Sequence, residues 1–187
     1  MPESDEESLI EQAKRDPLAF AQLYDRYINR IYAFALRQTG DEALAKDVTS
    51  ATFEKALHHI RRFRWRSVSF GAWLYRIARN EIAQHYRRRR WFVELSNFLR
   101  SDQEVESAVQ RREESDTLIA ALNRLSPSDR ELITLRFLEE LTSAEVAEVL
   151  GCSMPNLYLR LHRALKRLRQ QLETATFRNE DTVYVSE

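Results

Sequence analysis

The sequence is poor in the residues that interrupt or cross-link a chain. Its 187 residues include one cysteine, three glycines and four prolines. The single cysteine, Cys152, excludes a disulfide framework within the chain and suits a reducing compartment. The scarcity of glycine and proline leaves long uninterrupted segments, and these segments have helical rather than strand periodicity. The sequence therefore predicts an all-α fold.

Long apolar runs and enzymatic motifs are also missing. No stretch has the apolar length of a membrane span, and the acidic start MPESDEES is unlike a signal peptide, so we expect a cytoplasmic protein without membrane insertion. The sequence has neither a phosphate-binding glycine loop nor a Cys/His cluster with zinc-site spacing. We therefore expect no enzymatic activity, no metal and no cofactor, and we assign no catalytic residue.

The net charge is zero, but the charges are unevenly distributed. Residues 61–90 contain ten arginines and one acid, whereas residues 1–11 contain five acids and no base. Residues 101–116 contain six acids and two arginines. This distribution favours a polyanion-binding surface flanked by acidic segments. The alternative is that the acidic and basic segments pair within the fold.

The segment Leu141–Leu168 predicts two helices joined by a tight turn. Thr142 and Glu145 have the spacing of a capping box, which satisfies backbone N–H groups at a helix start. Gly151 is placed to end the first helix, because glycine adopts the left-handed conformation without a side-chain penalty. Ser153 is expected to cap the second helix. The pattern indicates a helix-turn-helix, although a plain helical hairpin has similar features.

The second helix of this pair is predicted to bind DNA. Between residues 153 and 171 it carries five Lys or Arg and no acid, which suits the major groove. Leucines at 157, 161, 165 and 168 predict the face that turns to the core. Polar side chains off that face are free to contact bases and phosphates. These candidates are Asn156, Tyr158, Arg160 and Arg163.

Periodicity and composition divide the chain into five segments. An acidic segment (1–17) precedes a helical domain (18–90) with helices at 18–38, 42–60 and 72–90. The first of these helices has one broad apolar face and is expected to end at Gly40, and Asp41 can start the second. A linker (91–116), with an apolar patch over 91–99, leads to a second helical domain (117–172). In this domain Ser126-Pro127 is expected to cap and open a helix that runs to about 139. The tail (173–187) lacks a helical stripe and is expected to be mobile.

Arginine and aromatic residues are interleaved in the predicted loop 61–71 and the helix after it. Cations can follow a nucleic-acid backbone, and aromatic rings stack on bases that have left a duplex, so this region favours single-stranded or opening DNA. Trp73 and Tyr75 are better explained as core residues. Trp65, between Arg64 and Arg66, is the stronger candidate for a base contact.

Two motifs in this order resemble one family, the bacterial sigma factors of the extracytoplasmic-function type within the sigma-70 family. The first half matches in TGDEALAKDVTSATFEKAL and FGAWLYRIARNEIAQHYRRRR. The second half matches in LSPSDRELITLRFLEELTSAEVAEVLGCSMPNLYLRLHRALKRL. The resemblance covers 18–90 and 117–172, and it implies a region 2 helical bundle and a region 4 helix-turn-helix domain.

The resemblance implies a protein that binds core RNA polymerase, directs it to promoters and helps to open the DNA. The implied contacts with core polymerase are Asp47, Val48 and Phe53. The implied contacts with the minus-ten element are Arg64, Trp65, Arg66, Arg79, Asn80, Gln84, Arg87 and Arg88. The implied contacts with the minus-thirty-five element are Ser153, Asn156, Tyr158, Arg160 and Arg163. Many relatives are held inactive by an anti-sigma protein, which is therefore a further expected partner.

The sequence departs from the family pattern at several of these positions. The docking segment usually reads Asp-Leu-x-Gln-Glu/Asp-x-Phe, but here it is DVTSATF, with Ser50 and Ala51 in place of the amide and the carboxylate. Gln84 stands where Asp is common, and Tyr158 where Lys or Arg is usual. These changes imply altered core contacts or promoter preference. The alternatives are a helix-turn-helix regulator that acts without polymerase and a module that binds an acidic protein partner.

Overall fold

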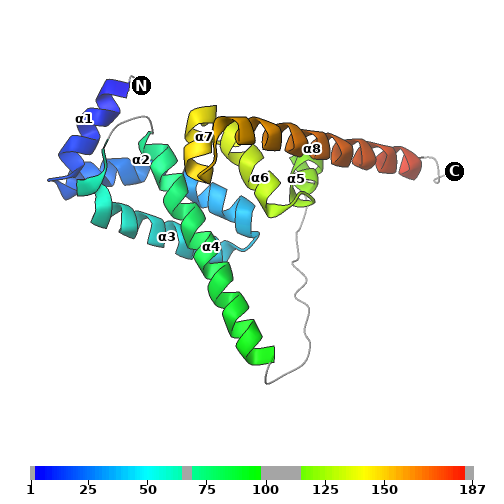
Figure 1. The fold of residues 1–187 in the computed structure, drawn as a ribbon, viewed down its shortest axis with the longest axis horizontal. Helices are drawn as coiled ribbons and strands as arrows, with labels where there is room; N and C mark the ends of the chain where they lie inside the picture. The colour runs from blue at the N-terminus through cyan, green and yellow to red at the C-terminus, as the bar shows by residue number, and fades with distance from the viewer. Residues whose placement is uncertain (1–2, 65–68, 98–114, 184–187) are drawn as a thin grey trace. The chain divides into compact units, whose positions relative to one another are not determined.

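The structure, a computed structural model, describes residues 3–64, 69–97 and 115–183 (Figure 1). The described residues form helices and turns, with no strand among them. The chain divides into two compact units, Met1–Ser107 and Ala108–Glu187. The predicted all-α fold with two helical domains is thus confirmed. Within the described ranges, no helix combines the length and apolar character needed to cross a bilayer.

The first unit is organised around α2 (Pro17–Thr39). This helix contacts α1 (Glu3–Ala13), α3 (Glu42–His59) and α4 (Phe70–Asn97). The apolar face that the sequence predicts for α2 is buried apart from Tyr24, which lies at its exposed edge. Its large buried side chains are Phe20, Leu23, Tyr27, Ile31 and Phe34.

Local signals determine where the helices of this unit begin and end. The Asp16 carboxylate accepts a hydrogen bond from the Leu18 amide at 2.9 Å and caps α2. Gly40 ends that helix with φ 67°, and Asp41 caps α3 by accepting from the Leu44 amide at 3.0 Å. The predicted roles of Gly40 as a stop and Asp41 as a start are confirmed.

The acidic N-terminal segment forms a helix, α1, that the sequence analysis did not predict. Ile10 and Ala13 are buried against the rest of the unit. The Glu6 carboxylate accepts a hydrogen bond from the Tyr27 hydroxyl at 2.5 Å and lies 3.5 Å from the Arg26 guanidinium. With so few apolar residues, α1 shows no clear stripe in the sequence, and its contacts with α2 hold it in place.

The second unit consists of shorter helices packed along one long helix. It contains α5 (Ser115–Asn123), α6 (Pro127–Ile133), a π-helical turn η2 (Thr134–Leu138), α7 (Ser143–Leu150) and α8 (Met154–Val183). Helix α8 contacts α5, α6 and α7. The single helix predicted from Ser126-Pro127 to about 139 is therefore divided into α6 and η2.

The predicted capping box and glycine stop of α7 are confirmed. Thr142 and Glu145 form both hydrogen bonds of the capping box, with the Thr142 amide donating to the Glu145 carboxylate at 2.9 Å. Gly151 ends α7 in the left-handed conformation, with φ 64°. Ser126 caps α6 by accepting from the Asp129 amide, and Pro127 occupies the first turn.

Two helices extend beyond their predicted ends. Helix α8 continues to Val183, so the prediction that its helical pattern stops at 172 was wrong. Helix α4 continues to Asn97, into the predicted linker. Neither 91–97 nor 156–183 contains glycine or proline, so nothing local interrupts either helix. An Arg169–Glu173 ion pair at 2.9 Å adds support at the i, i+4 spacing. The side chains of the predicted apolar patch at 91–99 lie outside the described residues.

Candidate nucleic-acid interface

Most aromatic side chains of the arginine-rich segment lie in the core of the first unit. Phe63, Phe70 and Tyr75 are buried, and Trp73 is half-buried. The Phe70 ring centroid lies 5.6 Å from that of Phe63 and 5.4 Å from that of Trp73. These rings hold η1 (Ile60–Arg62) and the start of α4 together. Tyr75 is therefore confirmed as a core residue, and Trp73 is in contact with the core as expected. Phe63 and Phe70, whose place among the arginines suggested base stacking, also lie in the core. Trp65 and Arg66 lie outside the described residues.

Helix α2 and the turn between α1 and α2 contact the segments on both sides of residues 65–68. The Tyr27 ring packs so closely on Gly71 that a Cβ atom there would lie 3.0 Å from Tyr27 Cε1. Burial and the hydrogen bond to Glu6 raise the pKa of Tyr27 above its usual value, so its hydroxyl remains a donor. On the other side, Arg61 Nε donates to the Lys14 carbonyl at 3.3 Å. The α1–α2 region thus holds both flanking segments in place.

Helix α4 carries polar residues toward its C-terminal half. Asn80, Arg87 and Arg88 are exposed, and Gln84 is half-buried. Because residues three and four positions apart share a helix face, Asn80, Gln84 and Arg87 form one row. Arg79 is half-buried, and Arg64 is exposed just before the segment 65–68. Of the described candidates for minus-ten recognition, those on α4 thus form a polar row with Arg79 beside it, and Arg64 lies apart from the row.

The three residues proposed to contact core polymerase have different environments. Asp47 is exposed on α3, whereas Val48 is 3% and Phe53 is 4% exposed. The Phe53 ring packs edge-to-face on Tyr24 with centroids 4.7 Å apart. Val48 and Phe53 therefore position α3 within the unit, and Asp47 is the exposed member of the three.

A shallow groove of about 190 Å³ lies where α3 and α4 run beside each other. Lys55 of α3 and Glu81 of α4 form an ion pair at 2.6 Å that joins the two helices. The groove brings Asp47, a candidate polymerase contact, to the same surface as Gln84 and Arg88, candidate DNA contacts. The groove is lined by Leu44, Asp47, Val48, Ala51, Glu81, Gln84, His85 and Arg88. The sequence did not predict this juxtaposition, because the residues come from separate helices.

The core face of α8 differs from its prediction at one position. Leu157 and Ala164 are fully buried, and Leu161 and Leu168 are half-buried. Leu165, which the leucine spacing placed in the core, is 39% exposed. A residue at i+8 is rotated by about 80° from residue i, whereas i+7 lags by only about 20°. Ala164 therefore occupies the core position that the sequence analysis gave to Leu165.

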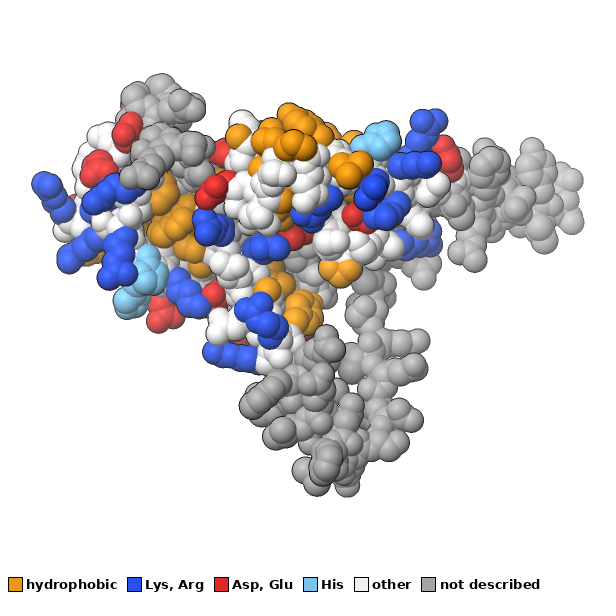
Figure 2. Space-filling model, in the orientation of Figure 1, with side chains coloured by type: hydrophobic (Ala, Val, Ile, Leu, Met, Phe, Trp, Pro, Cys, Tyr) orange, Lys and Arg blue, Asp and Glu red, His pale blue; other side chains and the backbone are white. Residues whose placement is uncertain are grey.

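The residues of α8 proposed to contact the minus-thirty-five element lie mainly on its outer surface. Asn156, Tyr158 and Arg163 are exposed, and Arg160 is half-buried. Ser153, directly before the helix, is also exposed. Figure 2 shows hydrophobic side chains gathered over the first turns of α8, followed by Lys and Arg side chains. The large exposed apolar side chains there are Tyr158 and Leu159. Leu159 is not among the contacts predicted from the sequence, because those were polar side chains able to contact bases and phosphates.

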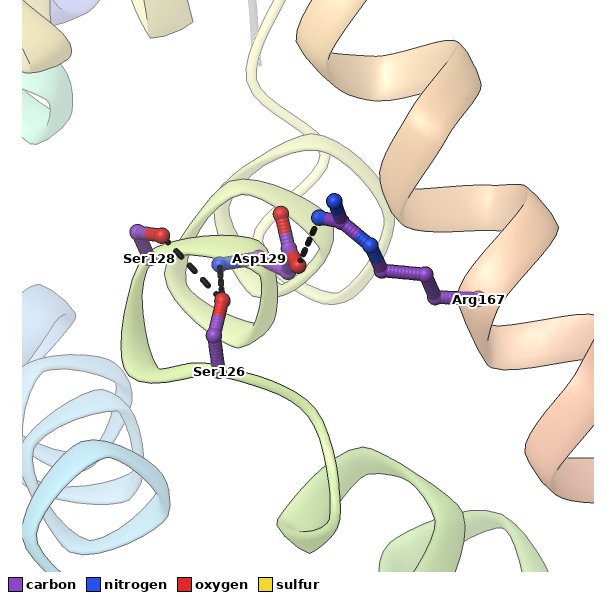
Figure 3. A network of polar contacts seen from close by, with 4 residues as sticks. All are labelled: Ser126, Ser128, Asp129 and Arg167. Atoms are coloured by element: carbon purple, nitrogen blue, oxygen red, sulfur yellow. Dashed lines mark hydrogen bonds and ion pairs between the residues drawn. The ribbon is translucent and has the colours of Figure 1, made fainter.

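One arginine of α8 is held by an ion pair within its own unit. Arg167 forms an ion pair with Asp129 of α6 at 2.7 Å (Figure 3). Asp129 is buried, and its amide donates to Ser126 Oγ at 3.2 Å. The basic residues of α8 therefore divide into one that fastens α8 to α6 and others on the outer surface.

Comparisons with known proteins identify the family of this chain. The model of Sigma-70 region 2 matches residues 23–92, and that of Sigma-70, region 4 matches residues 115–168. The chain is 30% identical over 151 residues to the ECF RNA polymerase sigma factor SigM of Bacillus subtilis, covering 79% of this chain and 91% of SigM. The chain belongs to the sigma-70 family. Members with these two regions act in transcription initiation and are not enzymes, in agreement with the prediction from the sequence.

Further sigma factors are similar in sequence and structure. The ECF RNA polymerase sigma factor BldN of Streptomyces coelicolor is 35% identical over 170 residues, or 88% of this chain and 64% of the length of BldN. The sigma factor RpoE of Bartonella quintana, solved with the anti-sigma factor NepR, has a TM-score of 0.68 at 26% identity, covering 82% of this chain and 96% of RpoE. CnrH, solved with the cytosolic domain of CnrY, has a TM-score of 0.65 at 29% identity, covering 90% of this chain and 97% of CnrH.

Proposed function

We propose that this sigma factor binds core RNA polymerase in the cytoplasm, directs it to specific promoters and assists the opening of promoter DNA. The proposal rests on one observation, which is that each of the two units presents an exposed polar and basic helix surface. The first surface lies on α4 in the match to region 2, and the second lies on α8 in the match to region 4. Two such surfaces suit the two elements of a promoter better than they suit a single duplex site.

The first unit is proposed to bind the minus-ten element. The cations Arg64, Arg87 and Arg88 would neutralise phosphates, and the row of Asn80 and Gln84 would contact base edges. Arg79 belongs to the same proposal as a half-buried residue beside that row. Trp65 is proposed to stack on a base that leaves the duplex, with Arg66 beside it on the backbone.

The second unit is proposed to bind the minus-thirty-five element through the first turns of α8. The N-terminal residues of a recognition helix meet base edges in the major groove. Asn156 and Arg163 are exposed and carry the groups that pair with adenine and guanine. Arg160 lies closer to the core and is better placed for a phosphate. Ser153 is proposed to contact a phosphate at the helix N-terminus. Tyr158 is proposed to contact the wall of the major groove beside the base edges.

Helix α3 is proposed as the docking site for core polymerase. Asp47 is exposed on this helix and lines the groove between α3 and α4. Val48 and Phe53 contribute by holding α3 in position. Because Asp47 and Gln84 line one groove, polymerase bound to α3 would lie beside the residues proposed for minus-ten recognition. The solved relatives that carry anti-sigma partners support a second proposal, that an anti-sigma protein controls access to these surfaces.

Run-off transcription on genomic fragments, with core polymerase and with or without this chain, tests the proposed function. We expect transcripts that require the chain, with start sites that share two upstream elements. Arg163→Ala should reduce these transcripts, whereas the matched variant Arg167→Ala should retain them at temperatures where it stays folded. The absence of chain-dependent transcripts and of co-purification with core polymerase would contradict the proposal. Tight sequence-specific duplex binding by the chain alone would then favour a regulator that acts without polymerase.

A further inference from the structure

We infer that Leu159 determines promoter specificity by packing on the C5 methyl group of a thymine in the minus-thirty-five region. This inference rests on the proposed function and adds the identity of a base that α8 recognises. It concerns an apolar contact, whereas the other candidates on α8 act through hydrogen bonds or charge.

Leu159 lies at the centre of the outward face of α8. Each residue advances about 100° around a helix, so Leu159 is turned about 200° from Leu157. Because Leu157 is fully buried in the core, Leu159 points away from it. Leu159 is also the sixth residue of the helix, which starts at Met154. It therefore lies in the N-terminal portion of α8, where a recognition helix meets base edges.

The surroundings of Leu159 favour DNA as the molecule that covers it. Leu159 is 50% exposed, and its neighbour Tyr158 is 56% exposed. Arg163, one turn further on, shares its face, and no acid occurs between residues 153 and 171. A partner that covers this face must accept several positive charges together with a small apolar surface. The major groove offers both, because the phosphates on either side are anionic and thymine carries a methyl group.

The chemistry of the base edges selects thymine. In the major groove, adenine, guanine and cytosine present hydrogen-bonding groups, whereas thymine adds a methyl group to its acceptor. A leucine side chain can neither donate nor accept a hydrogen bond. Covering the amino group of adenine or cytosine with it would leave a polar group without a partner. The methyl group of thymine instead gains a contact that removes apolar surface from water.

The test removes only the C5 methyl group of thymine, by replacing thymine with deoxyuridine. Holoenzyme assembled from core polymerase and the full chain is used to select promoters from a randomised duplex library. Each thymine of the selected minus-thirty-five element is then replaced by deoxyuridine. Burial of one methyl group corresponds to about a fourfold change in affinity, so we expect roughly that loss at one position. Leu159→Ala should abolish most of this sensitivity to deoxyuridine. Leu165→Ala, at an exposed leucine almost two turns further along α8, should retain it.

The outcomes distinguish this inference from the proposed function. If an element is selected but no thymine in it is sensitive to deoxyuridine, the inference is overturned and the sigma-factor function stands. If Leu159→Ala leaves the deoxyuridine effect intact and weakens binding to core polymerase, the leucine contacts protein and the inference also fails. A selection in which no element is enriched would overturn both.

Discussion

The two units use their aromatic residues in opposite ways. In the first unit the rings fill the interior, with Phe34 packed on Tyr75 at 5.2 Å and Tyr27 on Phe70 at 5.7 Å between centroids. In the second unit Phe137 and Tyr158 are exposed, and aliphatic side chains such as Leu132 fill the core. An aromatic residue beside an arginine therefore cannot be assigned to DNA binding until its burial is known.

The largest effect is expected from a substitution that disrupts the aromatic core of the first unit. Phe70 is fully buried and its ring contacts Tyr27, Phe63 and Trp73, so Phe70→Ala should lower the free energy of unfolding by about 3–5 kcal/mol. Urea denaturation followed by far-UV circular dichroism measures this change. Tyr158→Ala, at an exposed aromatic of the second unit, is the control and should change stability by less than about 0.5 kcal/mol. Equal losses in the two variants would show that the contrast between the units is wrong.

The next effect concerns DNA binding by the second unit. Arg163→Ala should weaken binding of holoenzyme to promoter DNA by about 1–3 kcal/mol if the side chain reads a base. Arg167→Ala removes the same charge from the same helix, but Arg167 is held by Asp129. We therefore expect a smaller loss of affinity for Arg167→Ala, measured by filter binding at physiological salt. A larger loss for Arg167→Ala than for Arg163→Ala would mean that the wrong face of α8 had been assigned to DNA.

A smaller effect tests how α8 is fastened to α6. Arg167→Ala should destabilise the protein by about 1 kcal/mol, because Asp129 is mostly buried but Arg167 remains half-exposed to screening by water and salt. Thermal unfolding at low and high salt measures this loss, which should shrink at high salt. Arg163→Ala is the control, since no comparable partner is seen for this exposed side chain among the described residues. A salt-independent loss would point to packing of the arginine stem instead of charge.

The smallest effect concerns a turn in the second unit. Glu140 has φ 56°, the left-handed conformation that glycine adopts at low cost and other residues adopt reluctantly. Glu140→Gly should therefore stabilise the protein by about 0.5–1 kcal/mol, seen as a higher midpoint of thermal unfolding. Glu148→Gly, within α7, is a matched control that should destabilise by a similar amount. No gain from Glu140→Gly would show that the turn is not strained.

Helix boundaries with local causes could be predicted from the sequence. Gly40, Asp41, Ser126, Gly151 and the Thr142–Glu145 pair act through hydrogen bonds within about four residues, so a short stretch contains the necessary information. Helical periodicity also predicted that Asn156, Tyr158 and Arg163 would lie on the outer surface of α8. The same method failed for Leu165, because a rule of four-residue steps accumulates a rotational error over two turns.

The sequence by itself determined the helical class, the two-domain order and most helix starts, since each depends on composition or on neighbouring residues. Only the tertiary structure decided which side chains remain available for binding. Packing buries Val48 and Phe53 of α3. It also brings Arg167 to Asp129, and it holds α1 on α2 through the hydrogen bond between Tyr27 and Glu6. It also brought Asp47 and Gln84 to one groove. Each of these features joins residues from different helices, and such contacts form only when the whole unit packs.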